Sequence, residues 1–166
     1  MRITRFYCPE VRPDTQLFTL PAAAHRHAIQ VLRLKKGDML RLFDGQGFEC
    51  EAELVEVSKR DSQVRLGEAL EIENESPIEI TLLQGISRGE RMDFALQKAV
   101  ELGVTKVIPV VTERCNVQLS NGRDEKRLAH WSGVMISACE QSGRNFVPEL
   151  TNVMELSEAL LASDAQ

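Results

Sequence analysis

Residues 78–111 read IEITLLQGISRGERMDFALQKAVELGVTKVIPVV, and this stretch decides the fold of the second half of the chain. Two apolar runs, Thr81–Leu83 and Val107–Val111, flank a segment whose apolar residues recur every three or four positions, as on one face of a helix. Gly103 stands where helices commonly end in a left-handed residue. Strands joined by a crossover helix are normally parallel, and continuous apolar runs are typical of strands buried on both faces. The stretch therefore predicts a strand–helix–strand unit of an α/β fold, which gives the fold and not the function. The predicted buried stripe of the helix comprises Met92, Ala95, Leu96, Ala99 and Leu102.

The first half of the chain predicts a different architecture, a small barrel or rolled sheet. Several short strands with turn signals and a single helix are typical of such folds. Asp44–Gly47 predicts a hairpin turn, because glycine accepts the positive φ that such turns need. The acidic segment Glu71–Pro77 ends in proline and reads as a boundary, so we expect domains at 1–74 and 75–166. Strands are expected at 2–7, 17–20, 39–43, 48–57 and 63–72, and one helix at 21–33 with Ala24, Ala28, Val31 and Leu32 on its apolar side.

The remainder of the second half predicts another helix, Asp124–Gly143, a short strand at 150–153 and a further helix from Ser157. Trp131 lies on the apolar stripe of its helix, so we expect a core anchor rather than a platform for a nucleic-acid base. With so few strands, the parallel sheet is too narrow to cover its own faces and edges. We therefore expect this domain to be incomplete. Neither of the common glycine-rich phosphate-binding patterns occurs.

Charge and cysteine usage limit the possible functions. The chain has 166 residues and a net charge of −5, so it is not a basic nucleic-acid-binding domain as a whole. Residues 26–41 nevertheless form a basic island, with five Lys or Arg side chains against Asp38 alone. The four cysteines contain no C-x-x-C pair, which favours free thiols in a reducing cytoplasm. The sequence shows no secretory or membrane-spanning segment, and its three scattered histidines suggest no metal site.

Several stretches of this sequence resemble the RsmE family. They are SRGERMDFALQKAVELGV (87–104), the P-x-x-x-E-R-C run from Pro109, and ACEQSGRNFVPEL (138–150). HAIQVLRLKKGD (27–38) and LFDG (42–45) resemble the PUA-like β-barrel of the same family. The resemblance implies a cytoplasmic, homodimeric enzyme of the SPOUT superfamily, whose catalytic domain ends in a trefoil knot. It implies S-adenosylmethionine-dependent methylation of uridine N3 in 16S ribosomal RNA, with no metal.

The sequence departs from the family in two ways. Gln30 stands where the family commonly has arginine, which removes one possible RNA contact. The glycine-rich G-P-E-G-G loop and the L-R-x-E-T segment, which form the knot and hold the methyl donor, do not occur. We therefore expect this chain to be a truncated, inactive part of the enzyme, and no cofactor-binding residue is assigned.

The candidate catalytic residues are Glu140, Gln141 and Arg144, at the end of a helix beside a glycine. Methyl transfer to uracil N3 requires in-line positioning, loss of the imide proton and stabilisation of charge on the flanking carbonyl oxygens. The planar guanidinium of Arg144 suits a uracil carbonyl or an RNA phosphate. The alternative is an exposed Glu140–Arg144 pair at i, i+4, a common helix stabiliser.

The candidate RNA-binding residues gather in two places. Arg33, Lys35 and Lys36, with His27 and Arg5, would contact phosphates, which position a protein without reading sequence. A solvated basic turn is the alternative. Arg88 and Arg114 follow the two strands of the second domain, where α/β folds usually place ligands, and a charged first helical turn is the alternative for Arg88.

Two other functions remain open on sequence grounds. One is an RNA-binding protein without activity, whose α/β half is an interaction module. The other is a metabolic α/β enzyme with an unrelated barrel. Titration with S-adenosylmethionine separates the enzyme from the binding module, and we expect no detectable binding to residues 1–166.

Overall fold

The computed structural model describes residues 3–72, 74–113 and 123–163, without the side chains of Arg123, Ala162 and Ser163. The chain forms two compact units, and each is considered by itself. The first comprises Met1–Asn74 together with Gly143–Phe146. The second comprises Glu75–Ser142 and Val147–Gln166. The sequence gives no sign that residues 143–146 belong with the first unit.

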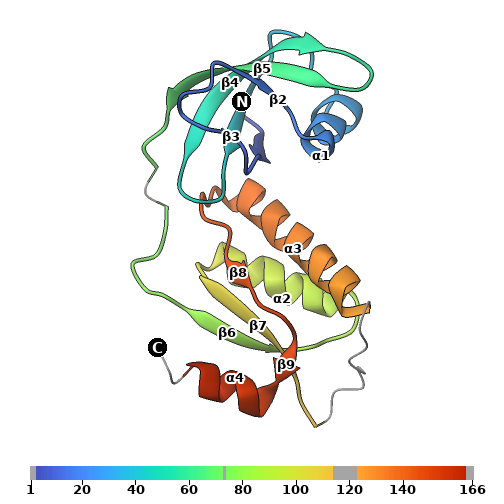
Figure 1. Ribbon diagram of the computed structural model, residues 1–166, viewed down its shortest axis with the longest axis vertical. Coiled ribbons are helices and arrows are strands. Elements are labelled where there is room, and N and C mark those ends of the chain that lie inside the picture. Colours follow the sequence, from blue (N-terminus) through green and yellow to red (C-terminus); the bar gives the residue numbers. More distant parts are fainter. Residues whose placement is uncertain (1–2, 73, 114–122, 164–166) are drawn as a thin grey trace. The chain divides into compact units, whose positions relative to one another are not determined.

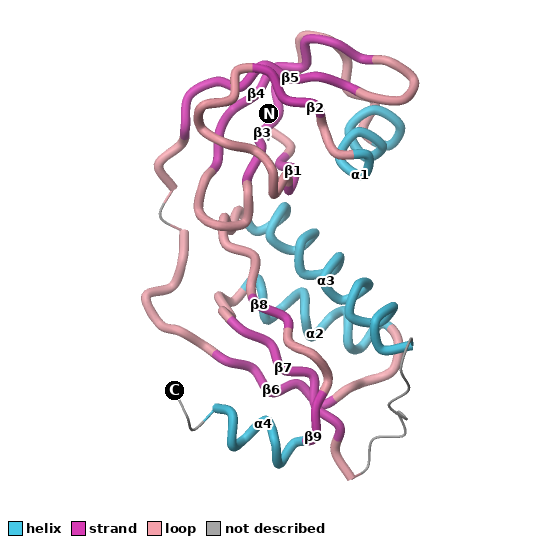
Figure 2. Tube along the Cα trace, in the orientation of Figure 1, coloured by secondary structure: helices cyan, strands magenta, loops and turns pink. Residues whose placement is uncertain are grey.

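The first unit is built on a five-stranded sheet with the order β1-β3-β4-β5-β2 (Figures 1 and 2). β1 runs parallel to β3, and the other neighbours are antiparallel. Every predicted strand is present, although the first and last are shorter than predicted. The strands are β1 (Arg5–Tyr7), β2 (Leu17–Thr19), β3 (Met39–Phe43), β4 (Glu49–Val57) and β5 (Ser62–Ala69).

The two faces of this sheet have different surroundings. Leu40 and Leu42 of β3 alternate toward a core that also holds Cys50, Ala52 and Leu54 of β4. The register of β4 against β5 shifts twice, between Cys50 and Ala52 and between Leu54 and Glu56, as at β-bulges. The alternation of side chains along the strands puts Arg41, Phe43 and Glu49 on the opposite face of the sheet. Apolar side chains from β1, β5, the helix and the loops near the N-terminus complete the core: Phe6, Cys8, Val11, Leu20, Ala24, Ala28 and Val64.

The predicted helix 21–33 ends earlier than predicted, at Val31, and consists of two parts. One α-helical turn, α1 (Ala22–His25), continues into a π-helical segment, η1 (Arg26–Val31). The backbone N–H of Leu32 donates to the carbonyl of His27, five residues back, at 3.0 Å. This wider turn rotates the last residues away from the core, so Val31 and Leu32 are 64% and 39% exposed. Their predicted burial is wrong, whereas that of Ala24 and Ala28 is confirmed.

The predicted turn at Asp44–Gly47 is confirmed. The Asp44 carboxylate accepts hydrogen bonds from the backbone N–H groups of Gln46 and Phe48, at 2.7 and 3.1 Å. Gly45 and Gly47 have φ values of 80° and 109°, which side-chain-bearing residues rarely adopt. The turn brings β3 back along β4 and delivers Glu49 opposite Phe43.

The second unit contains the predicted parallel sheet. β6 (Thr81–Gly85) pairs in parallel with β7 (Lys106–Val111). On its other side β7 pairs in parallel with two short strands, β8 (Glu149–Leu150) and then β9 (Met154–Glu155). These two replace the single strand predicted at 150–153.

Helices lie on both faces of this sheet (Figure 1). α4 (Leu156–Ser163) packs through Ala159 against Ile108 and Val110. The opposite face is covered by α2 (Glu90–Glu101) and α3 (Arg123–Ser142), which lie side by side. Trp131 is 5% exposed, so the predicted core anchor is confirmed.

The buried stripe of α2 is Met92, Leu96 and Val100. Leu102, which the periodicity places on this stripe, is 79% exposed. The helix ends at Glu101. Leu102, with φ −90° and ψ 2°, is no longer in a helical conformation. Gly103 follows with φ 96°, as predicted, so the chain turns away before Leu102 can reach the core.

Cys8, Cys50 and Cys139 are buried free thiols, as predicted, and Cys115 lies outside the described residues. Of the helices that the structure describes, none is long and apolar enough to cross a membrane.

Candidate functional site

Arg144 and Asn145 are buried in the first unit. Helix α3 ends at Ser142, and Gly143, with φ 91°, turns the chain out of the helix. Arg144 is 5% exposed and Asn145 is 2% exposed. An exposed helical Glu140–Arg144 pair, the alternative interpretation of this sequence, is therefore wrong, because Arg144 is neither helical nor exposed.

A buried ion pair lies under these residues. Glu49 is fully buried and accepts hydrogen bonds from Arg5, from Nη2 at 2.8 Å and from Nε at 3.1 and 3.2 Å. The same Nη2 donates to the carbonyl oxygen of Arg144 at 3.1 Å and to Oδ1 of Asn145 at 2.6 Å. One guanidinium thus joins a carboxylate of β4 to two consecutive residues of the 143–146 segment.

Further groups on this face of the sheet complete the cluster. The Arg5 guanidinium lies over the Phe43 ring, 4.5 Å from its centroid. Arg41 Nη1 lies 3.8 Å from Glu49, and its Nη2 donates to Glu51 at 3.3 Å. On the other, core-facing side of β4, burial and the neighbouring Glu49 carboxylate raise the pKa of the Cys50 thiol from 9.0 to about 11. Two buried donors of the cluster, Arg41 Nε and Asn145 Nδ2, have no hydrogen-bond acceptor among the described residues.

The segment Gly143–Phe146 is held to the first unit along its whole length. Asn74 Nδ2 donates to the Gly143 carbonyl at 3.2 Å. The Gly47 N–H donates to the Asn145 carbonyl at 3.2 Å, and Phe146 forms an antiparallel bridge with Gln46. The hairpin turn Asp44–Gly47 and the Arg5–Glu49 pair therefore hold consecutive residues of the segment.

The sequence marks neither Glu49 nor Asn145 as special. Glu49 alternates with the core residues of β4, so the pattern assigns it to a solvent-facing position. In the structure Glu49 is fully buried and paired with Arg5, a residue distant in sequence that also contacts residues 143–146.

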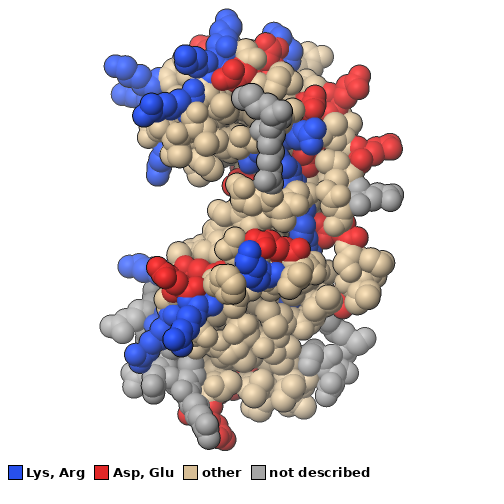
Figure 3. Space-filling view, turned by 180° about the vertical axis from the view of Figure 1, so that it is seen from behind, with Lys and Arg blue, Asp and Glu red and all other residues tan. Residues whose placement is uncertain are grey.

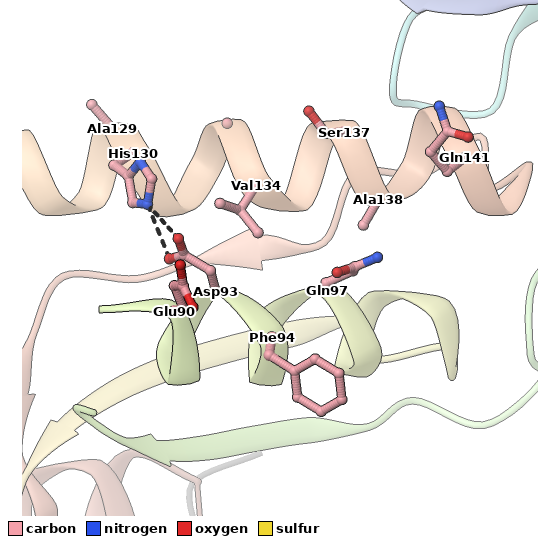
Figure 4. A pocket seen from close by; sticks show the side chains of 11 residues that line it. Glu90, Asp93, Phe94, Gln97, Ala129, His130, Val134, Ser137, Ala138 and Gln141 are labelled. Carbon is pink, nitrogen blue, oxygen red and sulfur yellow. Dashed lines mark hydrogen bonds and ion pairs between the residues drawn. The ribbon is translucent and has the colours of Figure 1, made fainter. Parts of the chain in front are cut away.

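Gln141 and Glu140 lie in the second unit. Gln141 is exposed, and Glu140 is half-buried. Gln141 lines one end of a groove of about 730 Å³ between α2 and α3 (Figure 4). Farther along the groove, His130 Nε2 lies 2.9 and 3.0 Å from the Asp93 carboxylate oxygens and links the two helices.

The predicted RNA-binding residues of the first unit fall into two groups. Arg33, Lys35 and Lys36 are exposed, and Arg33 has a φ of 58°, a strained value for a residue with a side chain. His27 is half-buried, with its ring edge-to-face on Phe6 at 5.6 Å. Arg5 is the exception, because its side chain is 8% exposed and bound to Glu49, a geometry that does not suit an RNA phosphate contact. On the face in Figure 3, Lys and Arg side chains gather over the upper part of the first unit.

The predicted contacts of the second unit lie near the carboxyl ends of its strands. Arg88 is exposed and follows β6, where it lines a cavity of about 260 Å³ with Arg127 and His130. Arg114 lies outside the described residues. Among the described residues, no group of three or more potential ligand side chains is placed to hold a metal ion.

The two halves of the chain match two protein-family models. Residues 74–166 match an RNA methyltransferase domain. Residues 20–67 match the PUA domain of RNA methyltransferases. The chain belongs to the RsmE family of SPOUT methyltransferases.

Individual members of the RsmE family resemble this chain over most of its length. Ribosomal RNA small subunit methyltransferase E of Buchnera aphidicola (subspecies Schizaphis graminum) is 36% identical over 91% of this chain and 61% of its own length. The crystal structure of this enzyme from Neisseria gonorrhoeae, bound to S-adenosyl methionine, is 46% identical. It superimposes with a TM-score of 0.91 over 96% of this chain and 65% of that chain. A putative methyltransferase from Legionella pneumophila in complex with the same cofactor gives 40% identity and a TM-score of 0.88 over 94% and 64%. This chain spans about three fifths of the length of these relatives.

Proposed function

We propose that this chain is the RNA-binding and substrate-orienting part of an S-adenosylmethionine-dependent enzyme that methylates uridine N3 in 16S ribosomal RNA. One observation supports the proposal most strongly. A PUA-domain match and an RNA methyltransferase match lie next to each other in one chain, and each corresponds to a folded unit. We further propose that the enzyme is a cytoplasmic homodimer, as the family resemblance implies.

In this proposal the basic island docks the RNA. The exposed side chains that follow η1 in the sequence are those of Arg33, Lys35 and Lys36. Phosphate contacts at these side chains orient the substrate without reading its sequence. His27 supports the same surface from its packed position on Phe6. Arg88, on an exposed loop after β6, contacts RNA from the second unit.

Residues in the last turn of α3 and just beyond it act on the uracil. When bound, S-adenosylmethionine supplies the electrophilic methyl group. Arg144 stabilises the negative charge that spreads onto the uracil carbonyls as N3 loses its proton, and Glu140 and Gln141 orient the base. The motifs that hold the donor in this family are not among residues 1–166, so no residue of this chain is assigned to bind it.

The test compares the protein expressed from the complete gene with its Arg144→Ala variant. Primer extension on 16S RNA from treated small subunits detects N3-methyluridine, which blocks base pairing. We expect the variant to lose at least about tenfold in turnover, the effect of one lost electrostatic contact. Unchanged turnover would remove Arg144 from the site. Absence of methylation by the unaltered protein would favour the alternative, an RNA-binding module without activity.

Two binding measurements on residues 1–166 accompany the kinetic test. Titration with S-adenosylmethionine should give no detectable heat. Affinity for 16S RNA fragments should fall steeply as salt rises, because phosphate contacts release counterions. RNA affinity that does not depend on salt would contradict the assigned role of the basic island.

A further inference from the structure

The contacts of residues 143–146 assign a role to two residues that lie far from Arg144 in the sequence. We propose that Arg5 and Glu49 are positioning residues that fix the Arg144–Asn145 main chain, and with it the direction of the Arg144 side chain. The proposal rests on the proposed function, because it concerns how that site is held. Arg5 itself touches no substrate.

Arg5 contacts the 143–146 segment at two consecutive residues. Its Nη2 donates to the Arg144 carbonyl at 3.1 Å and to Asn145 Oδ1 at 2.6 Å. The carbonyl contact fixes the peptide plane between Arg144 and Asn145. The side-chain contact fixes Asn145 itself. Because the side chain of Arg144 leaves the same backbone, its starting direction is set by Arg5.

The guanidinium of Arg5 is itself held in place. Three hydrogen bonds of 2.8 to 3.2 Å hold its guanidinium to Glu49, which is fully buried. A buried carboxylate needs its partner, since breaking such a pair leaves an uncompensated charge. The Phe43 ring, 4.5 Å away, fixes the plane from one side. Glu49 therefore fixes the position of the Arg5 guanidinium, and the guanidinium in turn fixes the position of residues 144 and 145.

A lysine at position 5 cannot reproduce this arrangement. The planar guanidinium presents several donors in fixed directions, whereas the ammonium of lysine is a single point charge. Arg5→Lys keeps the charge that Glu49 needs but cannot hold Glu49, Arg144 and Asn145 together. This variant therefore separates charge compensation from positioning.

The first experiment uses residues 1–166 and does not depend on activity. Trypsin cleaves after arginine, and the buried Arg144–Asn145 bond is accessible only when the segment opens. We expect cleavage at this bond, followed by mass spectrometry, to be about tenfold faster in Arg5→Lys, because cleavage tracks the open population. Asn145→Ala, which leaves the Arg5–Glu49 pair intact, should show the same increase. Arg65→Lys is the matched control, since Arg65 forms an exposed pair with Glu53 at 3.4 Å. Thermal unfolding of each variant shows whether the whole fold has been lost. If Arg5→Lys does not fold, Asn145→Ala provides the cleavage test by itself.

The second experiment measures methylation by the protein from the complete gene. We expect Arg5→Lys to lower kcat about tenfold, and to lower it no further in an Arg144→Ala background. A merely structural role would lower both backgrounds equally. Arg65→Lys should leave kcat unchanged.

The outcomes distinguish the two proposals. Cleavage at Arg144–Asn145 that is unchanged in both variants overturns the positioning role. A second result also overturns the positioning role: Arg5→Lys speeds cleavage but leaves kcat unchanged, while Arg144→Ala impairs turnover. In that case the proposed function still stands. If Arg144→Ala has normal turnover, the assigned site fails instead, whatever Arg5→Lys does.

Discussion

The ring of Phe146 occupies the space where a side chain on Gly47 would have to lie. A Cβ placed on Gly47 would be 2.6 Å from Cζ of that ring, closer than real Cβ atoms approach other atoms. Gly47 also has a φ of 109° and donates its N–H to the Asn145 carbonyl. The hairpin turn and the 143–146 segment therefore require glycine at this position for two separate reasons.

We expect Gly47→Ala to destabilise the chain by about 2 to 3 kcal/mol, from positive-φ strain together with the clash. Gly37→Ala is the control, because Gly37 has a φ of 92° with nothing within 4 Å of the added Cβ. Gly37→Ala should lower the free energy of unfolding only by the positive-φ strain, about 1 kcal/mol. Urea unfolding gives both values. Equal losses in the two variants would show that the ring moves aside without cost.

Removal of the Glu49 charge should be among the most damaging single changes to the first unit. Glu49→Gln leaves the buried Arg5 guanidinium without its counter-ion, which typically costs about 3 to 5 kcal/mol. Glu53→Gln removes the carboxylate of an exposed pair and should cost under about 1 kcal/mol. Denaturation curves of the two variants provide the comparison. A Glu49→Gln loss as small as that of Glu53→Gln would mean that water reaches this cluster.

The Cys50 thiol should react slowly for an electrostatic reason as well as a steric one. Its pKa of about 11, against 9.0 for a free thiol, lowers the thiolate fraction near neutral pH about 100-fold. We therefore expect iodoacetamide labelling of Cys50, measured by mass spectrometry at about pH 8, to require unfolding. Labelling as fast as in the urea-unfolded chain would contradict the burial.

The same pKa makes stability depend on pH. Because the folded-state pKa is raised, Cys50 contributes stability that is fully present below 9.0 and is lost as the pH rises toward 11. Cys50→Ala should therefore lose less stability than the unaltered chain across this interval. Urea midpoints at both ends of the interval give the difference, and parallel losses would exclude Cys50 as the cause.

Lys35 and Lys36 should determine how strongly RNA binding depends on salt. Both are exposed, so a double alanine variant of residues 1–166 should fold normally. We expect the slope of log affinity against log salt to become shallower by about 1 to 2. Lys98→Ala/Lys126→Ala removes equal charge from the helices of the second unit and should leave the slope unchanged. Filter binding across a salt series measures both, and an unaltered slope in the Lys35/Lys36 variant would favour a solvated turn.

The elements that were predicted correctly depend on local patterns. The parallel pairing of β6 with β7, the end of α2 at Gly103 and the turn at Asp44–Gly47 each follow from residues close together in sequence. The errors occur where an element departs from regular geometry. The π-helical segment turns Val31 and Leu32 outward, and the end of α2 does the same to Leu102.

The sequence by itself determined the α/β unit, the rolled sheet of the first half and the family resemblance, because periodicity and turn chemistry act within a few residues. Only the tertiary structure decided that Arg5 is buried against Glu49 and joined to Arg144 and Asn145. These contacts span 44, 139 and 140 positions along the chain. No local pattern encodes such a contact, since it depends on the register of β1, β3 and β4 and on the return of the chain after α3. A charge at a solvent-facing strand position becomes a buried anchor only when a distant segment covers it.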